Sequence, residues 1–226
     1  MALSANKILL NYRICLPERS EGPKHSGFNL PKETIFAKNL IMSEDLQDIT
    51  LKKPVLEMLT VANEYCYYFE HLAKKTHTEI LEFVSRIGPL LYLKGSLIPD
   101  VEVENPEANE RFFTPEEWET LFYSLRDIFG KYDEFWIIDP QYINENEPLK
   151  ASLSENLTDI YQDMKDFVLL YQRNTYAARQ NAVKEIRKLY ATHWGYRITN
   201  IMSKVHHLLY EEDSNSLPFM QSLDLF

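Results

Sequence analysis

Apolar residues recur at helical spacing along most of the chain after residue 50. When residues are placed at about 100° intervals, each of five segments gathers its apolar side chains on one face, as amphipathic helices do. These segments are 54–73, 77–98, 115–130, 153–172 and 177–211. The pattern predicts an all-α fold, a single bundle of about five helices with flexible N- and C-terminal tails.

Three of these segments begin with a capping box, in which a hydroxyl residue precedes a glutamate by three positions. The boxes are Thr76 with Glu79, Thr114 with Glu117, and Ser152 with Glu155. Between the helices, Phe135–Ile138 forms a short apolar run, and no second run in the pattern offers it a strand partner. We therefore expect that run to be a buried extended crossover rather than part of a sheet.

Composition supports the all-α class and excludes some classes of function. The chain has 226 residues but only six glycines, and it lacks the Asn-Gly and Asp-Gly pairs on which tight hairpins depend. Its net charge is −10, and residues 42–226 carry −13, so the body repels phosphate backbones and direct nucleic-acid binding is not expected. No apolar run approaches the roughly 20 residues of a membrane span, so we expect no membrane insertion and a cytoplasmic location.

Candidate chemistry is sparse. Cys15 and Cys66 have no metal-binding or redox spacing, and Cys66 lies on an apolar helix face, where a small buried hydrophobe is expected. The chain contains no Glu-x-x-His pair of the kind that holds a di-iron centre, and no phosphate-binding or nucleophile-elbow motif. We predict no metal, no cofactor and no catalytic residue from motifs.

Residues 1–41 differ from the rest of the chain. They carry a net charge of +3 and show no sustained periodicity. Within them, Leu16–Gly22 resembles the peptide that results when a common bacterial intergenic repeat is translated, and Met42 opens a plausible true start. We therefore expect 1–41 to be a disordered extension or to precede the true start. The helical domain would span 42–211, with a flexible tail over 212–226.

Several polar residues fall on or beside the apolar faces of the predicted helices. They are Lys94, Asp159, Asp163, Asp166, His193 and Arg197. A buried cation requires a carboxylate partner, so one interpretation is a structural ion network across the bundle. The other is a small polar pocket in which His193 transfers a proton and Asp159 or Asp163 orients it.

Three segments of the sequence carry a family resemblance. Leu91–Asp100, Asp159–Asp163 and His193–Gly195 resemble an all-helical bacterial family, domain of unknown function 5063. The likeness covers about residues 50–210. It implies a helical fold, offers no activity, and draws attention to four residues: Lys94, Asp159, Asp163 and His193.

The last six residues resemble a docking peptide. Bacterial replication and repair proteins bind the DNA polymerase sliding clamp through a six-residue motif. Its positions are Gln, any residue, Leu or Met, Ser or Asp, Leu, and Phe. The matching positions are Gln221, Leu223, Asp224, Leu225 and Phe226. The alternative is that the apolar residues of this tail fold back on the bundle.

Two functions follow from these observations. The first is a non-enzymatic interaction module that is recruited to the sliding clamp. The second is a small-molecule-binding or hydrolytic enzyme with a polar pocket around Lys94, Asp159, Asp163 and His193.

Overall fold

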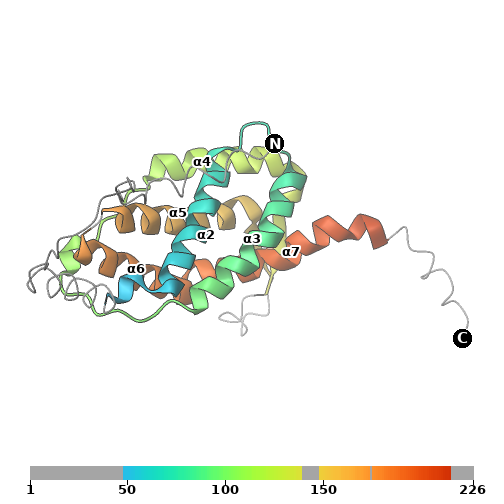
Figure 1. The fold of residues 1–226 in the computed structure, drawn as a ribbon. Coiled ribbons are helices and arrows are strands. Elements are labelled where there is room, and N and C mark those ends of the chain that lie inside the picture. Colours follow the sequence, from blue (N-terminus) through green and yellow to red (C-terminus); the bar gives the residue numbers. More distant parts are fainter. Residues whose placement is uncertain (1–47, 139–147, 174, 215–226) are drawn as a thin grey trace, which may run out of the picture. The chain divides into compact units, whose positions relative to one another are not determined.

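The computed structural model describes residues 48–138, 148–173 and 175–214, with side-chain surroundings up to residue 210 (Figure 1). The chain divides into two units, Met1–Ser43 and Glu44–Phe226, and all described residues belong to the second. Both the expected N-terminal extension and the candidate docking peptide at 221–226 therefore lie outside the described residues.

The described residues form six α-helices, which confirms the all-α class. The helices are α2 (Lys53–Glu70), α3 (His77–Ser96), α4 (Pro115–Phe129), α5 (Leu153–Gln172), α6 (Tyr176–Thr192) and α7 (Trp194–Ser214). Short 3₁₀ turns occur as η2 (Ile49–Leu51), η3 (Pro106–Ala108) and η4 (Gly130–Tyr132). Strands β1 (Glu134–Ile137) and β2 (Leu149–Ser152) form a small antiparallel pair.

Helix α5 is the centre of the bundle. Fourteen of its 20 residues are buried, because α2, α4, α6 and α7 all pack against it. Helices α2 and α3 form an antiparallel pair, since the Tyr68 hydroxyl donates to Glu79 O at one end while Lys94 meets Glu57 at the other. The remaining face of α3 packs on α7 and α6. Cys66 is buried in this core as predicted, and burial raises the pKa of its thiol to about 12.

The predicted helix starts agree with the observed caps. Thr76 and Thr114 each form the complete reciprocal capping box. The Ser152 hydroxyl accepts from Glu155 N, whereas the carboxylate of Glu155 lies 3.7 Å from Arg197. A residue that the pattern did not indicate completes this third helix start: the buried carboxylate of Asp133 accepts from Ser154 N at 2.7 Å. A negative charge at this position also suits the helix dipole.

The expectation for Phe135–Ile138 was wrong. Phe135 and its neighbours pair with Leu149–Ser152, in a register that places Trp136 opposite Lys150. Side chains alternate along β1 and the residue that follows it, so Phe135 packs against the core while Trp136 is 68% exposed and Ile138 is 78% exposed. The run is therefore one strand of a hairpin with an exposed face, because a four-residue strand buries only alternate side chains.

The single helix expected over 177–211 is two helices, α6 and α7. The break falls at His193, whose φ of −143° and ψ of −88° leave the helical region. Two residues later, a Cβ on Gly195 would meet Tyr190 O at 2.3 Å. Only glycine allows this close approach, so His193-Trp194-Gly195 forms a corner rather than continuing the helix.

Candidate polar site at the corner between α6 and α7

Three helices supply the polar side chains of this site. Asp159 and Asp163 lie one turn apart on α5, His193 ends α6, and Arg197 lies in the first turn of α7. Because α6 and α7 both pack against α5, the corner between them brings the two cationic side chains to the two carboxylates. We call these four residues the corner cluster.

The pairing within the corner cluster is specific. His193 Nδ1 donates to Asp163 Oδ2 at 2.6 Å, and Arg197 Nη2 lies 2.7 Å from Asp159 Oδ2. His193 Nε2 lies 3.8 Å from Asp159 Oδ2, so the imidazole faces both carboxylates. Trp118 of α4 donates its indole N–H to the second oxygen of Asp159 at 2.9 Å. Each buried carboxylate therefore has a hydrogen-bonded partner, as burial requires.

Burial and the shared hydrogen bond have opposite effects on the pKa of each member of the Asp163–His193 pair. The carboxylate of Asp163 is 4% exposed, and this burial raises its pKa although the hydrogen bond from His193 acts in the opposite direction. His193 is 32% exposed, and its hydrogen bond to Asp163 raises its pKa although burial opposes the rise. The imidazole therefore remains protonated to a higher pH than a free histidine.

Asp166 serves a different role from the other acidic residues of α5. Its Oδ1 accepts from the backbone amides of Phe112 at 2.7 Å and Phe113 at 2.9 Å. These bonds hold the segment that leads into α4. Asp166 and Asp163 also line a cavity of about 20 Å³, which has room for about one water molecule.

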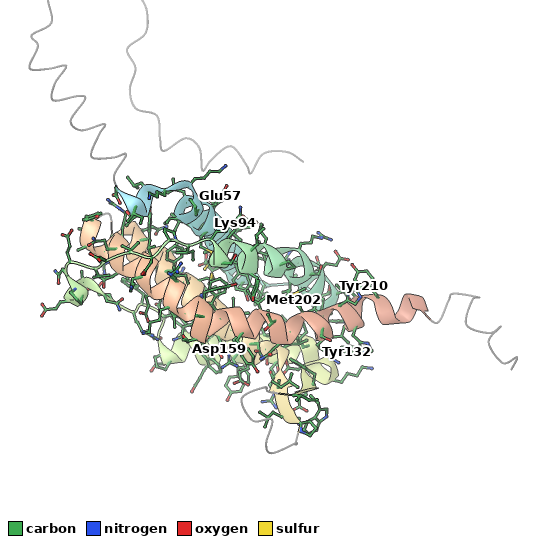
Figure 2. All side chains as sticks on the ribbon, turned by 90° about the horizontal axis from the view of Figure 1, so that it is seen from below. Glu57, Lys94, Tyr132, Asp159, Met202 and Tyr210 are labelled. Carbon is green, nitrogen blue, oxygen red and sulfur yellow. The ribbon has the colours of Figure 1, made fainter. Side chains whose placement is uncertain are left out.

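Lys94 lies apart from the corner cluster. Its Nζ lies 2.9 Å from Glu57 Oε2 on α2, and its side chain is 20% exposed. Figure 2 shows Glu57 and Lys94 together, well separated from Asp159. The expectation of one pocket that holds Lys94 with the aspartates and His193 is therefore corrected: Lys94 belongs to an ion pair between α2 and α3. The helical pattern places Lys94 in the middle of the apolar face of its helix, but it does not indicate which residue is its partner.

The motif residues around the corner cluster are packing residues. Trp194 is fully buried and donates its indole N–H to Ile186 O at 3.1 Å. Its ring lies against Gly95 of α3, where a Cβ would meet the ring at 2.3 Å. Gly195 allows the turn that follows α6. The segments around Gly95 and His193 pack closely because the absence of a side chain at Gly95 leaves room for the ring of Trp194.

Two residues of these polar sites were not found by sequence reasoning. The helical pattern of 115–130 places Trp118 on the apolar face, and nothing in it indicates that the indole N–H meets Asp159. Glu57 carried no signal beyond being an acidic residue on a helix. Over the residues that the structure describes, no group of three or more histidine, cysteine or acidic side chains is arranged to hold a metal ion. The same residues include no helix that is both long and apolar enough to span a bilayer.

Comparisons with known proteins agree with the fold. The family model described as "Domain of unknown function (DUF5063)" matches residues 49–211. The crystal structure of protein BF1032 from Bacteroides fragilis is similar, with 29% identity and a TM-score of 0.63. That match covers 72% of this chain and 96% of the Bacteroides chain. None of the curated proteins compared with this chain matches it.

Proposed function

Because the chain belongs to the family of the domain of unknown function 5063, whose description states no reaction, we propose a function from its own residues. The protein is a non-enzymatic interaction module: a helical body recruited to the bacterial sliding clamp through residues 221–226.

The pairing of side chains in the corner cluster supports the proposal that the helical body is not catalytic. Its carboxylates are held by His193, Arg197 and Trp118, at distances between 2.6 and 2.9 Å. The cavity against Asp163 holds about one water molecule, whereas small-molecule sites measure roughly 300–1,000 Å³. Side chains that satisfy one another next to so small a cavity stabilise the junction of three helices.

The sequence of the last six residues supports the recruitment. Leu225 and Phe226 would enter an apolar pocket of the clamp, Leu223 would cover a neighbouring surface, and Gln221 would hydrogen-bond at the rim. Such a peptide loses conformational entropy when it binds, so we expect micromolar affinity.

Calorimetric titration of a peptide spanning Pro218 to Phe226 into a purified bacterial sliding clamp tests this proposal. Replacing both Leu225 and Phe226 by alanine should abolish the heat of binding, because these side chains bury most of the apolar surface. Gln221→Ala should weaken binding by only about 1 kcal/mol, the usual net contribution of one hydrogen bond.

The full chain provides the second arm of this test. It should compete with the labelled peptide for the clamp, and a chain that lacks residues 221–226 should not. Failure of both the peptide and the full chain to bind at several hundred micromolar, roughly a hundredfold above the expected affinity, would refute the recruitment.

One observation favours the alternative function, a small-molecule-binding or hydrolytic enzyme. The 2.6 Å bond between Asp163 and His193, with the imidazole partly exposed, is the arrangement that a general base uses. A thermal-shift screen of small organic metabolites on the wild type and a His193→Gln variant tests it. A compound that raises the Tm of the wild type alone would favour the enzyme.

A further inference from the structure

A second feature of the molecule shares no residue with the corner cluster and lies between the end of α2, α4 and Tyr161 of α5. Figure 1 shows the end of α2 next to α4, and a groove of about 470 Å³ follows this junction. The volume falls within the range of binding sites in proteins. None of the residues of the corner cluster is among the described residues that line it.

The floor of the groove is aromatic and apolar. Tyr161 packs edge-on against Phe69 and Phe113, with ring centroids 6.4 and 5.1 Å away. Leu72 and Leu121 add to the apolar lining. Phe69 and Tyr161 are buried, so their positions are set by the core and the floor is rigid.

The rim of the groove is acidic. Glu70 is already neutralised, because Lys165 Nζ lies 2.5 Å from its Oε1. Glu116 and Glu117 lie in the first turn of α4, and no lysine or arginine among the described residues pairs with either. Glu117 uses one oxygen to accept from Thr114 N, and it remains exposed. Two carboxylates without a lysine or arginine partner among the described residues therefore line the same groove as the aromatic side chains.

We propose that this groove binds an arginine side chain presented by an extended segment of a partner protein. A guanidinium group hydrogen-bonds to carboxylates and stacks on aromatic rings, while its alkyl stem packs on apolar surface. The groove offers each of these contacts: Glu116 and Glu117 for the charge, the half-buried ring of Phe113 for stacking, and Leu121 for the stem. Because the groove is open, it admits one side chain of a polypeptide and leaves the rest of that chain outside. A small-molecule pocket would instead enclose its ligand.

The net negative charge of the helical body also favours a partner segment that carries arginine, because charge acts beyond the range of direct contact. Residues 42–226 carry a net charge of −13, which attracts a basic segment and speeds its encounter with the groove. This inference does not depend on recruitment to the sliding clamp, because the groove and residues 221–226 are separate parts of the chain.

The test measures fluorescence polarisation of a labelled pentapeptide with the full chain at about 50 mM salt, where charge interactions are only partly screened. The peptide has blocked ends and one arginine between two leucines, with glycine outside them. A matched peptide carries citrulline, which keeps the shape of arginine and removes its charge. We expect the arginine peptide to bind with a Kd of roughly 0.1–1 mM, and the citrulline peptide to bind about tenfold more weakly or not at all.

Paired variants separate groove binding from general attraction to an acidic protein. Replacing Glu116 and Glu117 by glutamine removes two charges at the rim, and glutamine at position 117 still fits the capping box. The control replaces Glu102 and Glu119 by glutamine, two exposed residues that do not line the groove. The rim variant should lose about tenfold in affinity, and the control should lose less than about twofold.

A third variant, Ser124→Trp, fills the groove without changing any charge. Ser124 is exposed, so the larger side chain should leave the Tm unchanged and abolish binding. Equal binding of the arginine and citrulline peptides, equal losses in the rim and control variants, or full binding by folded Ser124→Trp would each overturn the proposal.

Discussion

The indole of Trp194 lies directly on the backbone of Gly95. A Cβ built on Gly95 would be 2.3 Å from Trp194 Cη2 and 2.6 Å from the ring of Tyr190. These rings come from the end of α6 and the start of α7, so the absence of a side chain at one position of α3 lets both of those helices approach it. The turn at His193 and the location of the corner cluster both depend on this contact.

Gly95→Ala should therefore destabilise the protein. The added methyl group overlaps two large rings, one of them fully buried, and we expect a loss of about 1–3 kcal/mol in the free energy of unfolding. Urea denaturation followed by circular dichroism provides the measurement.

Gly88→Ala is the matched control on the same helix. Its Cβ would lie 3.0 Å from Met202 Sδ, on a flexible side chain that can move away. The higher helix propensity of alanine, worth up to about 1 kcal/mol, offsets that adjustment, so the net change should stay within about 1 kcal/mol. Equal effects of the two substitutions would contradict the role assigned to the contact between Gly95 and Trp194.

Removing Arg197 should leave the buried carboxylate of Asp159 without its closest cation. We expect Arg197→Met to cost about 2–4 kcal/mol, and Asp159→Asn in the same chain to recover part of this loss because the uncompensated charge is then gone. A double-mutant cycle measured by chemical denaturation gives the coupling energy.

Arg173→Met is the control for that cycle, since its pair with Glu110 at 2.9 Å is exposed at both side chains. It should cost no more than about 1 kcal/mol. A coupling energy near zero between Asp159 and Arg197 would show that the corner cluster does not hold the three helices together.

Lys94 and Glu57 should behave as a partly exposed pair. Lys94→Met alone should cost about 0.5–1 kcal/mol, because Glu57 can still be solvated. The double replacement Lys94→Met with Glu57→Gln should stay within about 1.5 kcal/mol of the wild type or exceed its stability. Lys53→Met, which removes the more exposed partner of Glu57 at 3.7 Å, is the control and should have no measurable effect in thermal denaturation.

The stability of the protein should fall as pH rises above about 6.5, the pKa of a free histidine. The pKa of His193 is raised in the folded state by its bond to Asp163. Its contribution is therefore complete below the unfolded pKa and is lost as pH rises through the folded pKa. Urea denaturation between about pH 6 and about pH 8.5 should show this decline, and His193→Gln should flatten it.

An NMR titration of the His193 imidazole checks the cause of that decline. A midpoint at or below that of a free histidine would show that the bond to Asp163 does not stabilise the charged ring. In that case any pH dependence would have to come from other groups.

Local sequence signals determined most of the helices. Thr76 and Thr114 cap α3 and α4 where the capping boxes indicated, because such a box is satisfied by residues three positions apart and needs no distant partner. Helical spacing of apolar residues likewise identified the segments of α2 to α5 and the burial of Cys66, since the side of a helix that faces a core must be apolar wherever the core lies.

Contacts between residues far apart in the chain decided the rest. The sequence around His193-Trp194-Gly195 is compatible with a continuous helix, and the break appears only when Trp194 is buried against Gly95. β1 needed β2, whose residues carry no strand signal of their own, as a hydrogen-bonding partner. A short strand gains its backbone bonds only from another segment, so its own pattern cannot identify it.

The polar residues show the same division. Sequence periodicity alone placed Asp159, Asp163, His193 and Arg197 on helix faces that turn toward a core, where a charged group needs a partner of opposite charge. It could not determine that His193 pairs with Asp163, that Arg197 pairs with Asp159, or that Lys94 pairs with Glu57. A helix face follows from about 100° of rotation per residue, but an ion pair depends on how separate helices are packed, and only the tertiary structure specifies that packing.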